Sequence, residues 1–396
     1  MPRAGRGIGA ALGLACALLA IGSAGAQPAT LPRSELGSGG GRYGTAVSWS
    51  GDVAVVGALA EGGDYVGAAY VYHRDQAGWH LGGILTPHAT SDHSFFGASV
   101  AVSDNDLAIG AWGSDVVELY SRGASGWTRT GELRPTDANA SHFGCNIALQ
   151  GDVLAIAAEH AGGEPGRPGA VHLYRRVSGA WHETAVLAPS GLTSGALFGS
   201  SLALAGDVLA VGAMHDEPGA DSSGAVYLYQ VGANGARLAQ RIAPPAGANA
   251  HYFGSTVVIT GDTLAVSAPG GDYGDYRSGP VFVYRLRNGT WTYQTQLGPV
   301  GGADQRFGID LAITSTGVAV AVATDNSAAG GSVSVLLYPY PKGQDVDAPE
   351  LLFATEAPQV RYVALATDGQ QLLVGAATGP AGRGSVYTLD SHGAHR

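Results

Sequence analysis

The sequence predicts an all-β protein, a seven-bladed β-propeller of four-stranded blades. Three observations support this fold class. One phrase recurs seven times along the chain at intervals of roughly 50 residues, which is typical of a repeated supersecondary unit. Each copy holds four short strand-like segments and no helical apolar period. Glycine supplies 63 of 396 residues and charged residues only 13%, which suits many tight turns between short strands.

The clearest copy of the phrase shows how one blade is built. FGSSLALAGDVLAVGA, from Phe198 to Ala213, contains two apolar runs joined by Gly206-Asp207, a two-residue hairpin signal. A loop of variable length leads to an alternating third strand, GAVYLY, and a fourth segment begins at Trp and ends near Pro, as in WHETAVLAP. The repeat glycines are Gly44, Gly97, Gly144, Gly199, Gly254 and Gly308, and Arg361-Tyr362 holds this register in the seventh copy.

The two ends of the chain predict how the ring closes. The last copy stops after its third strand, near Leu389, without a fourth. Ala29 to Leu36 precedes Gly44 in the way that a fourth-strand segment precedes Gly199. We therefore expect the N-terminal segment to complete the seventh blade as its outer strand, so that no seam is left open. The propeller is expected over residues 27–390, with a tail at residues 391–396.

The first 26 residues read as a signal peptide with cleavage after Ala26. Arg3 and Arg6 form a basic start, an apolar run follows, and Ala24-Gly25-Ala26 satisfies the small-residue cleavage rule. No later stretch approaches 18 apolar residues, so we expect no transmembrane segment. These features predict a secreted or periplasmic protein.

Charge and cysteine content narrow the classes of partner. The formal net charge is −11, and loss of Arg3 and Arg6 with the leader makes it more negative, which argues against nucleic-acid binding. Cys145 is the cysteine that remains after cleavage at Ala26, so no intramolecular disulfide is expected. It follows a repeat glycine beside an apolar strand, and we expect it to be buried as a small hydrophobic residue.

The repeated phrase resembles the FG-GAP repeats of integrin α-subunit propellers, and is most similar to their bacterial secreted relatives. The resemblance covers about Ala29 to Asp390. It implies that an aromatic residue and a glycine lead each innermost strand, with the aromatic ring in the core and the glycine allowing neighbouring blades to approach closely. The aromatic positions are Phe96, Phe143, Phe198, Phe253 and Phe307, with Tyr43 and Tyr362 standing in. Trp79, Trp127, Trp181 and Trp291 are expected to pack on the fourth strands.

Calcium is expected to be absent from the site that the resemblance suggests. Integrin-type repeats hold Ca²⁺ in an acidic loop between strands one and two, and such an ion needs six to eight oxygen ligands. Here that loop has shrunk to two residues in most blades, and its aspartates read as turn formers. We expect no metal and no other cofactor.

Candidate ligand-binding residues lie in the loops that the resemblance places on one face of the ring. They are Trp112, His215, Asp216, Asp221, His251, Tyr252, Asp272, Tyr273, Asp275 and Tyr276. Tyrosines and acids around a concave face suit a carbohydrate or a peptide, and the alternative is a solvated acidic rim. Trp112 follows a strand directly before a very short loop, where it either packs over that loop or offers a stacking surface.

The leading functional hypothesis is a secreted, non-enzymatic binding propeller that presents its loop face to an extracellular or envelope glycan, a surface polymer or a protein. One alternative is a structural or adhesive envelope protein without a defined pocket. Another is a hydrolase or lyase with a site at the channel mouth. No zinc-ligand spacing and no nucleophile elbow occur in the sequence, so no catalytic residue is assigned.

Overall fold

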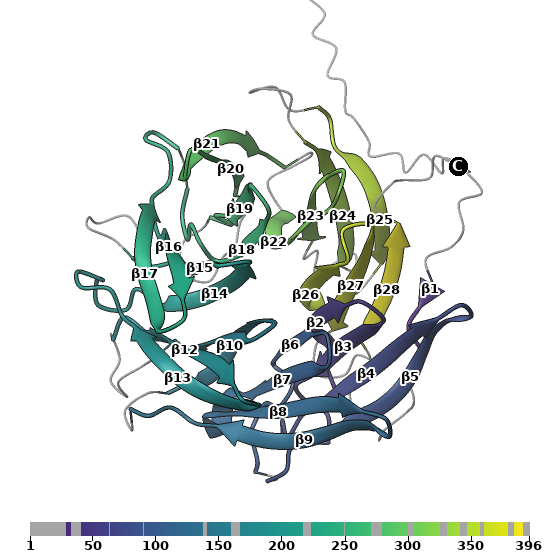
Figure 1. Cartoon of the computed structure of the whole chain (residues 1–396). Coiled ribbons are helices and arrows are strands. Elements are labelled where there is room, and N and C mark those ends of the chain that lie inside the picture. The colour runs from purple at the N-terminus through teal and green to yellow at the C-terminus, as the bar shows by residue number, and fades with distance from the viewer. Residues whose placement is uncertain are drawn as a thin grey trace, which may run out of the picture.

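The protein is a ring of seven blades around a central opening, as the computed structural model shows (Figure 1). The structure describes residues 29–32, 41–62, 64–89, 91–137, 141–159, 167–216, 223–248, 250–270, 279–299, 305–324, 331–340, 347–356, 360–378 and 384–390. These residues form seven four-stranded antiparallel sheets, each with its first strand at the centre and its fourth at the rim. The predicted fold class is confirmed.

The first four blades follow one another along the chain. The first blade comprises β2 (Tyr43–Ser50), β3 (Val53–Ala58), β4 (Ala68–Asp75) and β5 (Gly78–Leu85). The second comprises β6 (Ser99–Ser103), β7 (Asp106–Ala111), β8 (Val116–Gly123) and β9 (Gly126–Leu133), with a 3₁₀ turn η1 (Trp112–Ser114) after β7. The third comprises β10 (Phe143–Gln150), β11 (Val153–Ala158), β12 (Ala170–Val177) and β13 (Ala180–Leu187). The fourth comprises β14 (Phe198–Ala205), β15 (Val208–Ala213), β16 (Ala225–Gly232) and β17 (Gly235–Ile242).

The remaining three blades complete the ring. The fifth comprises β18 (Val257–Thr260), β19 (Thr263–Ser267), β20 (Val281–Arg287) and β21 (Thr290–Leu297). The sixth comprises β22 (Gln305–Ile313), β23 (Gly317–Thr324), β24 (Ser332–Pro339) and β25 (Glu350–Glu356). The seventh comprises β26 (Val360–Thr367), β27 (Gln371–Thr378) and β28 (Ser385–Asp390), with β1 (Ala29–Thr30) as its outer strand.

The N-terminal strand closes the ring as expected. β1 pairs antiparallel with β28, with Ala29 opposite Thr388 and Thr30 opposite Tyr387. Leu31 extends this contact because its N–H donates to the carbonyl of Val386, and its side chain is buried in the core of the first blade. The first and last segments of the chain therefore share one sheet. The expected signal peptide, residues 33–36 of the closing segment and the C-terminal tail lie outside the described residues.

The glycines of the repeat permit close contact between blades. A Cβ on Gly57 of β3 would collide with the carbonyl of Gly97 in the second blade, and one on Gly212 of β15 would collide with that of Gly254 in the fifth. Polar side chains of the first strands add hydrogen bonds across the same boundaries. Ser99 donates to the Gly144 carbonyl at 2.6 Å. The repeat glycine Gly97 shows the same crowding, because a Cβ there would collide with the Ala68 carbonyl of the first blade. Neighbouring blades thus approach closely at the repeat glycine, as the FG-GAP resemblance implied.

The aromatic residues of the repeat form the core, with one exception. Phe96, Phe143, Phe198, Phe253 and Phe307 are fully buried, and Tyr43 is 1% exposed. The four fourth-strand tryptophans also pack against the blade cores, as expected. Tyr362, however, is 39% exposed, so its expected core role is wrong. The seventh blade lacks the bulge-forming glycine, and Val360 fills the core there instead.

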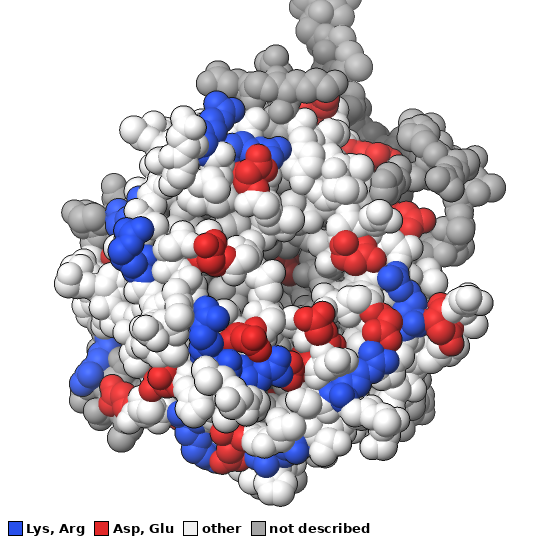
Figure 2. All heavy atoms as spheres, viewed as in Figure 1, with Lys and Arg blue, Asp and Glu red and all other residues white. Residues whose placement is uncertain are grey.

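Ion pairs connect neighbouring blades near the turns between first and second strands. Arg122 of the second blade contacts Asp52 of the first, and Arg176 of the third contacts Asp106 of the second. Arg74 of the first blade reaches Asp368 of the seventh. On the face shown in Figure 2, acidic and basic side chains accordingly lie next to one another around the central opening.

Candidate functional site

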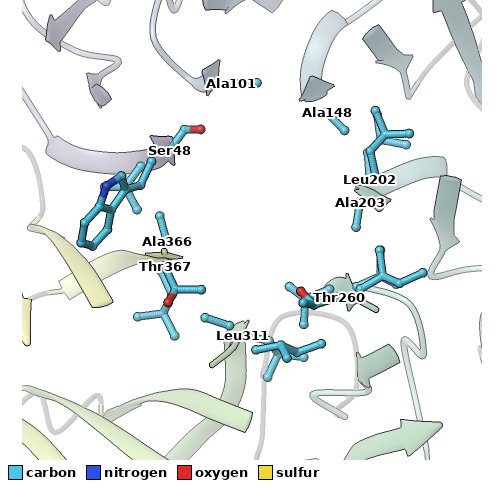
Figure 3. Close-up of a pocket in the computed structure, with 18 of the residues that line it drawn as sticks. Ser48, Ala101, Ala148, Leu202, Ala203, Thr260, Leu311, Ala366 and Thr367 are labelled. Atoms are coloured by element: carbon cyan, nitrogen blue, oxygen red, sulfur yellow. The ribbon is translucent and has the colours of Figure 1, made fainter. Parts of the chain in front are cut away.

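The central channel offers little chemistry to a ligand. It is a hollow of about 340 Å³ lined by the seven innermost strands. Ser48, Ala101, Ala148, Ala203, Leu311 and Ala366 surround the opening (Figure 3). The described residues that line it are apolar, small or hydroxyl-bearing, so it contains no charged group that could fix a polar ligand.

A more varied pocket lies where the loops lead into the innermost strands of the first three blades. Its volume is about 430 Å³, within the range of about 300–1,000 Å³ that is common for small-molecule sites. Its main lining side chains are Arg42, Phe95, Trp112, His142, Glu159 and Tyr362, and we call this site the aromatic pocket. Because these residues come from blades seven, one, two and three, only closure of the ring brings them together.

A turn repeated in several blades aims side chains at this face. The residue two places before the repeat glycine adopts a left-handed backbone conformation in blades one to five, with φ of 53° at Arg42, 54° at Phe95 and 59° at His142. Its carbonyl accepts a hydrogen bond from the N–H three residues later, as between Arg42 and Thr45 at 3.2 Å. Side chains at this position leave the strand direction and stand at the mouth of the ring.

The second blade provides the aromatic floor of the pocket. The rings of Phe95 and Trp112 stack with centroids 4.2 Å apart and an interplanar angle of 4°. His142 of the third blade meets Trp112 edge to face, at 4.7 Å between centroids. Trp112 therefore packs against Phe95 and His142 and also lines the pocket. Both interpretations of Trp112, as a packing residue and as a stacking surface, hold in part.

The two charged groups of the pocket come from different blades. Arg42 belongs to the first blade, and its guanidinium lies 5.0 Å from the centroid of the Tyr65 ring and 5.7 Å from that of Tyr362. Glu159 follows β11 in the third blade. The pocket therefore combines a cationic group, an aromatic floor and a carboxylate.

Cys145 lines the aromatic pocket but is a poor nucleophile. Burial raises the pKa of its thiol far above the ordinary cysteine range. The sulfur lies 3.6 Å from the Ala157 carbonyl oxygen. The side chain is partly buried and packs against the core between blades three and four, so it is less enclosed than the sequence predicted.

The residues expected as ligand contacts in blades four and five are arranged differently. His215 and Tyr252 contact each other, with ring centroids 5.1 Å apart, and burial lowers the pKa of His215. Asp216 is 2% exposed, and its carboxylate accepts hydrogen bonds from Tyr227 and Arg241. These contacts make Asp216 part of the blade interior. His251 is half-buried, and its carbonyl accepts a hydrogen bond from Gly270.

Half of the expected contact residues cannot be placed. Asp221, Asp272, Tyr273, Asp275 and Tyr276 lie outside the described residues. Within the ranges that are described, no three His, Cys, Asp or Glu side chains are grouped so that they could hold a metal ion. The described part of the chain also contains no helix with the length and hydropathy of a membrane span.

Sequence reasoning found Trp112 but missed most of its partners in the pocket. Arg42, Phe95 and His142 share the position two residues before the repeat glycine. Leu59, Trp112 and Glu159 share the position after the second strand. A comparison of these two positions blade by blade would have revealed the cluster. Tyr362 carried no such signal, because the register shift of the seventh blade falls between Val360 and Tyr362 and follows no repeat glycine.

The closed ring and the repeated glycine contacts define a β-propeller assembled from one sequence repeat. The sequence profile of the FG-GAP repeat matches residues 181–229 and 237–284, which span parts of blades three, four and five. The chain is therefore a seven-bladed β-propeller that carries recognisable FG-GAP repeats in blades three to five. No curated protein sequence matches it significantly.

Among solved structures, the chain is similar to one titled Kuenenia stuttgartiensis hydrazine synthase. The TM-score is 0.58 at 12% sequence identity, and the alignment covers 86% of this chain and 94% of the other. At that identity the similarity shows the shared fold alone.

Proposed function

We propose that this protein is a secreted or periplasmic binding propeller whose ligand site is the aromatic pocket. The single observation behind this proposal is the convergence of Arg42, Trp112 and Glu159 from three blades on one hollow of about 430 Å³. A rigid scaffold that gathers an aromatic surface and a few polar groups in a concavity is the usual design of a binding site. A glycan, a surface polymer and a protein segment are the ligand classes that fit.

His215 and Tyr252 are proposed to extend the site along the same face. They occupy, in blades four and five, positions close to those that Trp112 and Phe95 occupy in blade two. No cofactor enters the proposal, because the turns between first and second strands hold too few oxygen ligands for calcium. An unchanged affinity in the presence of a chelator is therefore expected.

Affinity capture with the full chain from envelope and polysaccharide fractions tests the proposal. Trp112→Ala should abolish capture, because it removes the aromatic floor. Met214→Ala is the matched control, since Met214 occupies the same repeat position in the fourth blade and does not line the pocket. Equal capture by the wild type and the Trp112 variant would refute the aromatic pocket as the binding site.

A structural or adhesive role is the second candidate, and the rim of the ring favours it. Exposed apolar side chains occur on the outer strands of four consecutive blades: Val186, Leu238, Tyr293 and Leu351. Such residues suit assembly through the rim. Size-exclusion chromatography of the native protein separates the two candidates, since an assembly protein elutes as a large complex whose size falls when Leu238 and Leu351 are replaced by Ser.

A further inference from the structure

We propose that the aromatic pocket selects an acidic sugar unit, with Arg42 binding the anionic group and the Phe95–Trp112 pair packing against the sugar ring. This inference rests on the proposed function and adds the chemical class of the ligand. Three observations support it: Arg42 has no acidic partner among the described residues, Phe95 and Trp112 provide an aromatic surface, and Glu159 lines the pocket from another blade.

Arg42 is held in place but lacks an acidic partner among the residues that the structure describes. Its Nη2–H donates to the Tyr65 hydroxyl at 3.2 Å, and its Nε–H is buried with no acceptor. A guanidinium has five N–H donors, and buried donors almost always have partners. An anion entering the pocket would supply acceptors for the Nη donors that the Tyr65 hydroxyl leaves unused.

Two arginines share this state, Arg42 and Arg306, which also has a buried Nε–H without an acceptor but does not line the pocket. Five other arginines are paired. Arg74, Arg122, Arg176, Arg241 and Arg285 all form ion pairs with aspartates. Those pairs lie between or within blades and have an evident structural role. Arg42 instead lies against the faces of Tyr65 and Tyr362 at the wall of the pocket. Cation–π contacts orient the guanidinium without neutralising its charge.

The floor favours a ring with an apolar face. Phe95 and Trp112 stack with parallel ring planes, so each covers one face of the other, and His142 meets Trp112 edge to face. A ligand ring would pack on an outer face of this stacked pair. A sugar presents axial C–H groups on one face and hydroxyls around its rim, so it can pack on such a surface while its hydroxyls reach polar groups. Glu159 and Thr45 line the same pocket and supply oxygen acceptors.

The charge distribution sets the direction of the ligand. Glu159 in the third blade repels an anion, whereas Arg42 in the first attracts it, so the acidic group is directed toward the first blade. The formal net charge of −11 opposes a long polyanion. A single acidic unit, such as a chain end, therefore fits better than a uniformly charged polymer. A carboxylate and a sulfate ester share the required chemistry.

The test is a set of matched sugars titrated into the full-length protein and followed by tryptophan fluorescence and calorimetry. The probes are a disaccharide ending in glucuronate, its methyl ester, the corresponding glucose disaccharide and a glucose 6-sulfate disaccharide. We expect the glucuronate probe to bind at least about tenfold more tightly than the ester or the glucose form, because a charge-assisted hydrogen bond is lost in each. The sulfate probe shows whether the pocket prefers a carboxylate or accepts both.

Arg42→Gln should reduce the affinity for the acidic probe to that of the neutral ones and leave neutral binding unchanged. Arg306→Gln is the matched control, because Arg306 holds the same repeat position in the sixth blade and does not line the pocket. Equal affinity of acidic and neutral sugars, or a preference that survives Arg42→Gln, would overturn the inference. So would binding of a peptide with a free carboxyl terminus in place of every sugar.

Failure of the inference and failure of the proposed function give different results. Suppose that the wild type binds neutral and acidic sugars equally and that Trp112→Ala abolishes binding of both. The aromatic pocket is then the binding site, but its selectivity for an acidic sugar is refuted. If Trp112→Ala changes no binding at all, the pocket itself is not the site. Thermal unfolding of each variant confirms that it is folded.

Discussion

Arg122 in the second blade forms a two-pronged ion pair with Asp52 in the first, with Nη1–Oδ1 and Nη2–Oδ2 distances of 2.8 Å. The two residues are far apart in sequence and belong to different sheets. Arg122 occupies the seventh position of a third strand, and Asp52 lies in the two-residue turn of the preceding blade. A similar relationship joins Arg176 to Asp106 and Arg74 to Asp368. An arginine at one repeat position thus reaches an aspartate of the preceding blade at three blade boundaries in the described part of the ring, although the aspartate stands at a different place each time.

Replacing Asp52 by Asn should destabilise the protein by less than about 1 kcal/mol, because half of the aspartate side chain is exposed and solvent screens the pair. The Arg122 hydrogen bond lowers the pKa of Asp52. The contribution is therefore present above the ordinary aspartate pKa of about 3.9 and is lost as the pH falls below it. Urea unfolding at pH 7 in low and high salt measures the effect, which should shrink in 1 M salt.

Asp207→Asn is the matched control for this pair. Asp207 lies in the equivalent turn of the fourth blade. The third strand of the fifth blade, however, has Leu286 at the position that Arg122 occupies in the second blade, so Asp207 has no arginine at that position to pair with. The Asn variant at Asp207 should show no salt-dependent loss. A larger loss at Asp207 than at Asp52 would contradict the pairing argument.

Gly57→Ala should destabilise the protein by about 1–3 kcal/mol, because the new Cβ overlaps the Gly97 carbonyl of the next blade. Gly83→Ala in the same blade is the control, since a Cβ there meets nothing within 4 Å and its backbone is not left-handed. Chemical unfolding of both variants checks the expectation. If the two alanine variants lost equal stability, close approach of blades would not explain the glycine at this position of the second strand.

Leu31→Ala should cost about 2–5 kcal/mol, because Leu31 is 5% exposed and packs with the core of the first blade where the ring closes. The loss should appear as a lower melting temperature measured by circular dichroism. Leu238→Ala provides the comparison, since Leu238 is 41% exposed on an outer strand. If Leu31→Ala left the melting temperature unchanged, closure of the ring through the N-terminal segment would be contradicted.

Asp216→Asn should destabilise the fourth blade by about 2–3 kcal/mol, because the carboxylate is buried with Arg241 and Tyr227. Burial by itself raises the pKa of Asp216, but the hydrogen bonds from Tyr227 and Arg241 outweigh it and lower the pKa. The native state therefore loses this stabilisation as the pH falls through the acid range below about 4.

Unfolding of the wild type and the Asp216 variant at pH 7 and pH 3 measures this difference, which should shrink at pH 3. Asp104→Asn, in an exposed turn, should have little effect at either pH. A constant difference between wild type and Asp216→Asn at both pH values would show that the charge of Asp216 does not contribute.

Alkylation of Cys145 should be slow in the native protein, because burial raises the pKa of its thiol and only the thiolate reacts quickly. Iodoacetamide labelling at pH 8, followed by mass spectrometry, should proceed much faster in denaturant. Saturating the aromatic pocket with a bound ligand should slow native labelling further, since Cys145 lines that pocket. Native labelling at the rate of an unfolded cysteine would disprove burial.

Much of the fold was predictable because the repeat is local. The Gly51-Asp52 hairpin and the alternating third strand depend on neighbouring residues, so each blade can be identified from its own segment. The closing strand was predictable from the missing fourth strand of the last copy. The aromatic pocket was not, because Arg42, Trp112 and Glu159 come from three blades, and their convergence depends on how the blades are rotated about the ring.

The sequence by itself determined the number of blades, the strand order within each and the closure of the ring, since these follow from periodic burial and turn chemistry. Only the tertiary structure decided which side chains meet. The tertiary structure brought residues of blades seven, one, two and three together in the aromatic pocket. It also buried Asp216 beside Arg241 and left Tyr362 exposed. The physical reason is that contacts within a blade are encoded by adjacent residues, whereas contacts between blades depend on the geometry of the closed ring.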